Sequence, residues 1–323
     1  MSAALRVHTW RGEAAITLAA GAYTTTFLPE CGLLGVSLTH DGDELLALPR
    51  SIADYRRGMP RGGYTGLPLN APYANRLATH RYTAFGREAR VSRRAATDRN
   101  RLPIHGTLEG QAFAVDSVAT DGDVATLRAS FRHDDPVLLE TFPFEHRYDV
   151  TVELSARGLA ITTSVTSCER APVPVSFGWH PFFRVPGALR GRWSLRLPPR
   201  RHARLDDHLL PTGTWRREPA EDRPLARRTF DDHYALSRDR RFSLCGADRR
   251  IDVRFDRGYP FAQIYVPAAG AAGWLTTDFV CIEPMTAPIN ALLDGVAPTT
   301  PHTAVFRVAA HRPRTAAGVT NVD

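Results

Sequence analysis

Polar and apolar residues alternate along much of the chain, and this alternation predicts strands. Between residues 148 and 154 the apolar side chains point to one side and the polar ones to the other. After a turn at 155–158 the same alternation resumes over 159–165, which predicts a hairpin. Shorter segments of the same kind lie at 15–18, 23–28, 124–131, 251–255, 262–266, 279–282 and 304–308.

Helical periodicity is weak by comparison. Residues 51–57 and 230–236 could each form one or two helical turns, and the Pro- and Arg-rich segment 198–228 is expected to be an excursion loop. The chain contains 24 glycines and 24 prolines, which favour turns between short strands. It is therefore expected to be all-β, as an antiparallel sandwich or barrel. No internal repeat or long linker divides it, so one domain over 1–310 and a tail over 311–323 are predicted.

All 41 basic residues are arginine. The lack of lysine excludes Schiff-base chemistry, a P-loop lysine and a lysine base. The net charge of +7 could suggest a nucleic-acid partner, but the arginines are scattered without interleaved aromatic runs, so a solvated surface is the better interpretation. No stretch of eighteen apolar residues and no signal-peptide pattern is present, so a cytoplasmic protein without a membrane partner is expected.

Four cysteines are spread widely along the chain, at 31, 168, 245 and 281. None lies in a CxxC pair, so the sequence offers no zinc-site spacing. The pattern predicts reduced, mostly buried thiols.

Glu283 is the most informative single residue. An apolar run ends at this carboxylate and Pro284 follows at once. Because proline cannot donate to a sheet ladder, the strand is expected to stop or bulge there, with Glu283 aimed from its end. Apolar neighbours would raise its pKa toward the range of a general base. A structural ion pair at a strand end is the alternative.

Other positions combine unusual local chemistry. Arg76 follows Asn75 among apolar residues, His105 precedes a glycine, and His180 lies within an aromatic cluster at 176–183. Two aspartates, one of them Asp231, come before a histidine. Each has a structural alternative: a surface ion pair for the arginine, packing for the histidines and aromatics, and a turn or cap for an aspartate.

In this order the motifs resemble those of the aldose 1-epimerase (galactose mutarotase) family, over roughly residues 32–308. The segments that carry the resemblance are Tyr73-Ala74-Asn75-Arg76-Leu77, His105-Gly106, His180-Pro181-Phe182-Phe183, Phe261-Ala262-Gln263-Ile264-Tyr265 and Glu283-Pro284 with Pro288 and Asn290. The resemblance implies a single large antiparallel β-sandwich of the galactose mutarotase type, with few short helices and an open sugar cleft.

The resemblance also implies roles for individual residues. Glu283 would be the general base and His180 the general acid, with His105 assisting at the ring oxygen. Sugar hydroxyls would be held by Asn75, Arg76, Asp231 and Gln263. No metal or other cofactor is implied.

Two departures from the family pattern concern the pocket wall. Trp179 stands where the family often has asparagine, and Thr107 stands where it often has a second glycine. We therefore expect Trp179 to contact the substrate and both residues to affect which sugar is bound.

The predicted function is interconversion of the α and β anomers of an aldose, with a small sugar as the partner and a monomer or homodimer as the assembly. The first alternative is a hexose-6-phosphate 1-epimerase of the same fold, for which Arg56, Arg57 and Arg61 could bind the phosphate. The second is a non-catalytic carbohydrate-binding protein, which would not need both His180 and Glu283. A nucleic-acid-binding β-sandwich is supported by charge alone.

Overall fold

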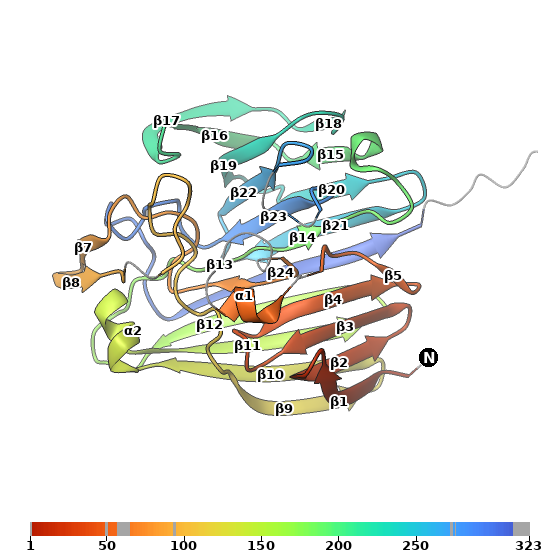
Figure 1. Cartoon of the computed structure of the whole chain (residues 1–323), viewed down its shortest axis with the longest axis horizontal. Coiled ribbons are helices and arrows are strands. Elements are labelled where there is room, and N and C mark those ends of the chain that lie inside the picture. The colour runs from red at the N-terminus through yellow and green to blue at the C-terminus, as the bar shows by residue number, and fades with distance from the viewer. Residues whose placement is uncertain are drawn as a thin grey trace, which may run out of the picture.

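The chain folds into stacked antiparallel sheets (Figure 1). The computed structural model describes residues 2–48, 51–56, 65–92, 95–271, 274 and 276–312. A five-stranded sheet contains β1 (Ala4–Trp10), β2 (Glu13–Ala20), β3 (Tyr23–Leu28), β4 (Leu34–His40) and β5 (Asp43–Glu44). It covers the end of a nine-stranded sheet, where β2 contacts β10 and β11.

The nine-stranded sheet has the order β18 (Glu221–Pro224), β15 (Ser194–Leu197), β20 (Arg241–Cys245), β21 (Arg250–Arg257), β24 (His302–His311), β12 (Gly158–Ser167), β11 (His146–Ser155), β10 (Val124–His133), β9 (Ala114–Asp121). The eight-stranded sheet has the order β17 (Pro211–Glu218), β16 (Arg200–Leu205), β19 (Phe230–Leu236), β22 (Phe261–Val266), β23 (Val280–Met285), β13 (Gly178–Trp179), β6 (Leu69–Asn70), and β14 (Phe182–Phe183) pairs with β23 beside this path.

The remaining elements are small. A two-stranded sheet joins β7 (Arg81–Ala84) and β8 (Arg87–Arg90), and the helical elements are α1 (Ile52–Arg56), α2 (Pro136–Thr141) and the 3-10 turn η1 (Arg190–Arg192). Among the described residues, no helix has both the length and the apolar character needed to span a membrane. The all-β antiparallel sandwich expected from the sequence is confirmed.

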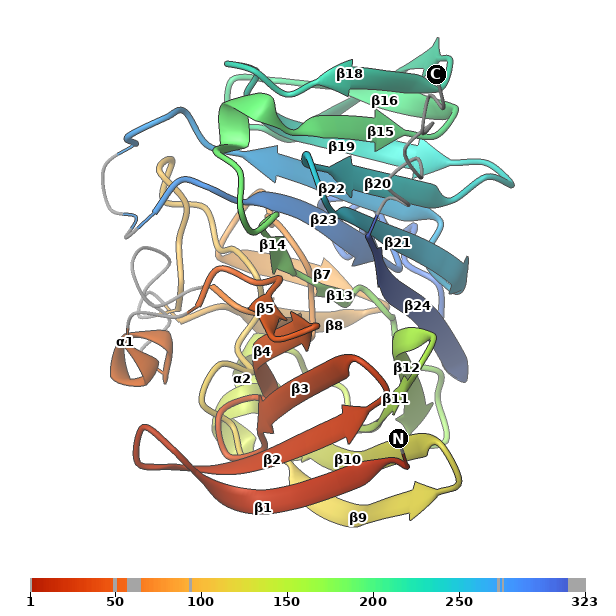
Figure 2. The same ribbon diagram turned by 90° about the vertical axis from the view of Figure 1, so that its right-hand side faces the viewer.

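The sheets lie in layers (Figure 2), and one large core of buried side chains lies between them. It combines inward-facing residues of all three large sheets, for example Phe27 of β3, Val152 of β11 and Ile282 of β23. The predicted hairpin at 148–165 is confirmed as β11 and β12, with Ser155 opposite Gly158. Gly158 has φ 110°, and a Cβ there would lie 2.2 Å from the carbonyl oxygen of Val308, so only glycine fits this turn.

Two predictions of local structure are wrong. Residues 230–236 form strand β19, which pairs with β16 and β22 on its two sides, so ladder hydrogen bonds outweigh a weak helical pattern. The expected loop over 198–228 contains β16, β17 and β18. The predicted helix at 51–57 is present as α1, although residue 57 lies outside the described part of the chain.

The strand that carries Glu283 does not stop at Pro284, contrary to the prediction. β23 continues to Met285, and Pro284 lies opposite Ala262 of β22. On the other side of β23, the ladder passes from β14 to β13 with an interruption at residues 180–181. A proline fits here because no neighbouring strand needs its missing amide.

Candidate active site

The interruption in the ladder brings His180 against Glu283. His180 links β13 to β14, and its backbone amide donates to the carbonyl oxygen of Pro68 at 2.9 Å. Its Nε2 lies 3.1 Å from Oε1 of Glu283, and both side chains are almost completely buried. The ring of Phe182 stacks on the imidazole, with centroids 4.5 Å apart and planes inclined by 15°. The backbone and this stacking ring therefore fix the orientation of the imidazole.

Burial sets the protonation of this pair. It raises the pKa of Glu283 well above its ordinary value, the Asp231 carboxylate raises it further, and the Arg76 guanidinium opposes the change. Burial also lowers the pKa of His180 to about 3. Both shifts have the same cause, because burial disfavours the charged form of each group.

A second histidine, His105, packs against His180. The two rings meet edge to face, with centroids 5.0 Å apart. Burial lowers the pKa of His105 well below its ordinary value, and the neighbouring His180 and Arg76 add to the effect. Asn70 Nδ2 donates to His105 Nδ1 at 2.8 Å, which places the proton of the neutral imidazole on Nε2.

The backbone around His105 explains the adjacent glycine. Gly106 packs so closely on the neighbouring segment that a Cβ would lie 2.0 Å from the carbonyl oxygen of Ala71. His105 itself has φ 67°, a strained value for a residue with a side chain. The sequence pair His-Gly is therefore the signature of this tight contact.

Arg76 organises the polar wall of the site. Its Nε donates to Asp98 at 2.8 Å, its Nη2 to Asp231 at 3.1 Å and its Nη1 to the side-chain oxygen of Asn75 at 3.0 Å. Gln263 Nε2 donates to the other oxygen of Asp231 at 2.7 Å. One buried guanidinium thus holds three neighbouring polar groups at fixed positions.

These groups surround a cavity of about 360 Å³, here called the inner cavity. Seven of the eight predicted site residues line it, namely Asn75, Arg76, His105, His180, Asp231, Gln263 and Glu283. The choice of Asp231 over its neighbour is consistent with strand alternation, because Asp232 faces away and accepts from Tyr234 Oη at 3.1 Å.

The eighth prediction is wrong, because Trp179 does not line the inner cavity. It is completely buried in the main core, where its Nε1 donates to Thr163 Oγ1 at 3.0 Å. Adjacent residues of a strand point to opposite faces, so with His180 in the cavity Trp179 must face the core. Thr107, the other departure, does not line the cavity either.

Several lining residues were not predicted. Asp98 reaches Arg76 from a loop 22 residues further along the chain, and its spacing gives no sequence signal. Tyr265 and Trp274 form an aromatic side with Phe182, and the ring centroids of Phe182 and Trp274 are 5.9 Å apart. Tyr265 ends the glutamine-bearing segment, and the aromatic residues there and at Trp274 are the sequence signal that could have suggested this wall.

Of the three arginines proposed for a phosphate, Arg56 is the one that the described residues include, and it does not line the cavity. Arg56 binds Glu13 at 2.7 Å and Cys31 Sγ at 3.2 Å, and it is not among the lining residues. Arg57 and Arg61 lie outside the described residues. The exposed Arg99 does line the cavity, and among the described residues it has no acidic partner.

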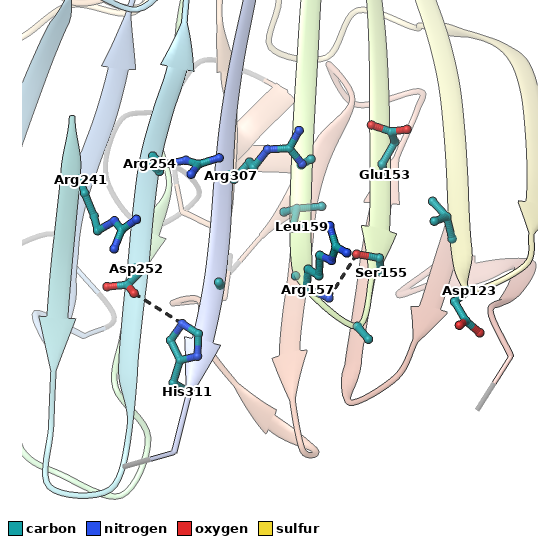
Figure 3. Close-up of a pocket in the computed structure, with 15 residues that line it drawn as sticks. Asp123, Glu153, Ser155, Arg157, Leu159, Arg241, Asp252, Arg254, Arg307 and His311 are labelled. Carbon is teal, nitrogen blue, oxygen red and sulfur yellow. Dashed lines mark hydrogen bonds and ion pairs between the residues drawn. The ribbon is translucent and has the colours of Figure 1, made fainter. Parts of the chain in front are cut away.

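A second, larger hollow of about 970 Å³ lies on the outer face of the nine-stranded sheet, here called the outer groove (Figure 3). Arg241, Arg254 and Arg307 stand directly opposite one another across β20, β21 and β24. Arg254 and Arg307 both pair with Asp256, at 2.5 and 2.6 Å. These side chains are about half exposed, and the groove has no buried carboxylate–imidazole pair, so it is the weaker candidate for chemistry.

Known structures share the whole fold of this chain. A galactose mutarotase-like protein from Clostridium acetobutylicum is 20% identical and superposes with a TM-score of 0.82 over 97% of this chain and 99% of its own. A galactose 1-epimerase from Lactobacillus acidophilus NCFM is 13% identical, with a TM-score of 0.74 over 96% and 98%. A putative aldose 1-epimerase from Escherichia coli K12 is 17% identical, with a TM-score of 0.70 over 96% and 100%.

No curated protein matches the chain. The profile of the aldose 1-epimerase family matches residues 14–295, which is most of its length. The chain therefore belongs to the aldose 1-epimerase family.

Proposed function

We propose that the protein interconverts the α and β anomers of a free aldose. The observation that supports this most directly is the buried His180–Glu283 pair on the inner cavity, in contact at 3.1 Å. A cavity of about 360 Å³ is in the size range of small-molecule sites. The aromatic side suits the C–H face of a sugar ring, and the Arg76 wall suits its hydroxyls.

The reaction requires two proton transfers at oxygens on the same carbon. The base removes the proton of the C1 hydroxyl, and the acid protonates the ring oxygen as the bond from C1 to that oxygen breaks. The open aldehyde turns about its C1–C2 bond and closes on the other face, with the two roles reversed. Neighbouring groups that hold one proton between them can perform both transfers without a change in net charge.

In this scheme Glu283 is the base and His180 the acid. The raised pKa of Glu283 makes its carboxylate a stronger base, and the lowered pKa of His180 makes its protonated imidazole a stronger acid. His105, protonated on Nε2, lies next to His180 and would donate a hydrogen bond to the ring oxygen. Asn75, Arg76, Asp231 and Gln263 would position the hydroxyls.

The test is anomer exchange measured by NMR, with glucose, galactose, other aldoses and their 6-phosphates as substrates. Acceleration for a free aldose that disappears in Glu283→Gln supports the proposal. A folded wild-type protein that accelerates none of the free sugars contradicts it.

A phosphorylated aldose is the second candidate, because Arg99 lines the cavity without an acidic partner among the described residues. A guanidinium is well suited to a phosphate. Activity confined to the 6-phosphates, and lost in Arg99→Ala, would favour this candidate over the free sugar.

A further inference from the structure

Cys281 lies directly behind the His180–Glu283 pair. It precedes Glu283 by two residues on β23, so the two side chains share one face of the strand. Its register partner is Phe182, two residues beyond His180. One ring nitrogen of His180, the sulfur of Cys281 and one oxygen of Glu283 all lie within 4.8 Å of one another, and all three residues are buried. The fold thus brings His180 beside Cys281 and Glu283, two metal-ligating residues of a strand that lies far from it in the sequence.

The spacing of these donors is close to that of a metal site. Zinc binds thiolate, imidazole and carboxylate at about 2.0–2.3 Å in tetrahedral geometry, which places two donors about 3.6 Å apart. The His180–Glu283 separation of 3.1 Å is already shorter than this. Side-chain rotations that move the donor atoms by about 1 Å would therefore bring all three within bonding distance of one ion. Three protein ligands would leave a fourth position open for a water molecule, and two of the three ligands, His180 and Glu283, line the inner cavity.

Charge and donor type narrow the class of cation. A thiolate and a carboxylate together neutralise a doubly charged ion, which a buried site requires. On binding, the thiol proton and the proton shared by His180 and Glu283 are released. Magnesium and calcium prefer six or more oxygen donors, whereas a nitrogen, sulfur and oxygen set suits zinc and similar ions.

We propose that a divalent cation of the zinc class binds to His180, Cys281 and Glu283 and blocks the active site. The binding depends only on the three donors. The inhibition rests on the proposed function, because the ion would occupy the two groups that transfer protons.

Cobalt(II) tests binding independently of activity. With wild-type protein, we expect the near-ultraviolet absorption of a thiolate–cobalt bond and its loss when Zn²⁺ is added. Cys281→Ser should remove this absorption, while Cys31→Ser and Cys168→Ser should retain it. Cys31 is a buried cysteine held by Arg56, and Cys168 is exposed, so they control for thiols elsewhere. No absorption in wild type, or the same absorption in Cys281→Ser, would overturn the proposal.

Inhibition is then measured by anomer exchange with Zn²⁺ and with Mg²⁺. Zn²⁺ should inhibit the wild type, Mg²⁺ should not, and EDTA should restore the rate. Cys281→Ser should keep its basal activity and need at least about tenfold more Zn²⁺ for the same inhibition. Equal sensitivity of the two proteins would contradict the role of Cys281. A cobalt–thiolate band in a protein that accelerates no sugar would support the metal site and refute the proposed function instead.

Discussion

The inner cavity and the outer groove use the same ionisable residue types in opposite surroundings. In the inner cavity the Asp98 side chain is only 4% exposed, and Arg76 holds it. In the outer groove Arg307 is half exposed beside Asp256. Ion pairs near water contribute little because solvent screens them, whereas buried groups interact strongly and shift in pKa. Surroundings rather than residue type therefore separate a reactive site from a charged surface.

The largest expected difference between the inner cavity and the outer groove concerns the effect of their carboxylates on the mutarotation rate. Glu283→Gln removes a buried proton-transfer group and should reduce the mutarotation rate by about 10²–10⁴-fold. The matched change in the outer groove, Glu153→Gln, should leave the rate nearly unchanged. His180→Asn should resemble Glu283→Gln, since a proton must pass through both. Anomer exchange by NMR gives the rates, and wild-type-like activity in Glu283→Gln would refute the assigned roles.

The two arginines should differ in stability as well as in binding. Arg76→Ala leaves Asp98 buried without its partner and should cost about 3–5 kcal/mol. Because Arg76 also positions groups that bind ground and transition states alike, KM should rise more than kcat falls. Arg307→Ala should cost about 0–1 kcal/mol. Urea unfolding measures the stability of the two variants, and steady-state kinetics measures KM and kcat. An equal loss of stability in Arg76→Ala and Arg307→Ala would show that burial is not the deciding difference.

A buried histidine pair that does not line the inner cavity tests how burial affects stability without an effect on catalysis. His133 and His146 are buried and stack on each other, with ring centroids 4.7 Å apart, and neither lines the inner cavity. Burial lowers the pKa of His133 to about 4 and of His146 to about 3, from an ordinary value of 6.5. Below pH 6.5 the unfolded chain therefore binds more protons than the folded one, and stability falls as the pH falls.

Between pH 7 and pH 5 this loss should be about 2 kcal/mol for each of the two histidines. The double change of His133 and His146 to Phe keeps two stacked rings but removes the titration. Its free energy of unfolding should vary less with pH, even if it starts lower. A pH dependence as steep as that of the wild type would show that these histidines do not govern acid stability.

The smallest expected effect is that of substituting Trp179. This substitution tests whether the side chain serves the core or contacts the sugar. Trp179→Phe removes the hydrogen bond to Thr163 and should reduce stability by about 1–3 kcal/mol. KM and sugar preference should not change, because the side chain does not reach the cavity. A changed sugar preference at unchanged stability would restore the pocket-wall interpretation.

The sequence predicted those strands that have one buried and one exposed face, such as β11 and β12. It failed for β17, whose residues are mostly exposed, because no core imposes alternation there. It also failed for β19, whose short pattern resembled a helical turn until its two neighbours were known. Alternation is visible in a sequence only where the two faces of a strand differ.

The site was predictable from motif order, because His180, Glu283 and their neighbours are short local signatures. Asp98 was not, because its role depends on a loop that meets Arg76 only in three dimensions. The triad with Cys281 was also hidden, since the cysteine spacing excludes the usual zinc patterns. Trp179 was assigned to the pocket wall wrongly, although neighbouring residues in extended backbone point to opposite sides and Trp179 directly precedes His180.

The interruption of the ladder at residues 180–181 has a consequence for redesign. Glu283 lies in β23, and His180 lies between β13 and β14, which both pair with β23, whereas Asp98, Arg99 and Trp274 approach the same cavity from loops. The proposed proton-transfer pair and part of the cavity lining are therefore carried by separate parts of the chain. Libraries that vary Arg99 and Trp274 but keep Asp98, the buried partner of Arg76, should yield variants with new sugar preferences that retain the proton-transfer pair.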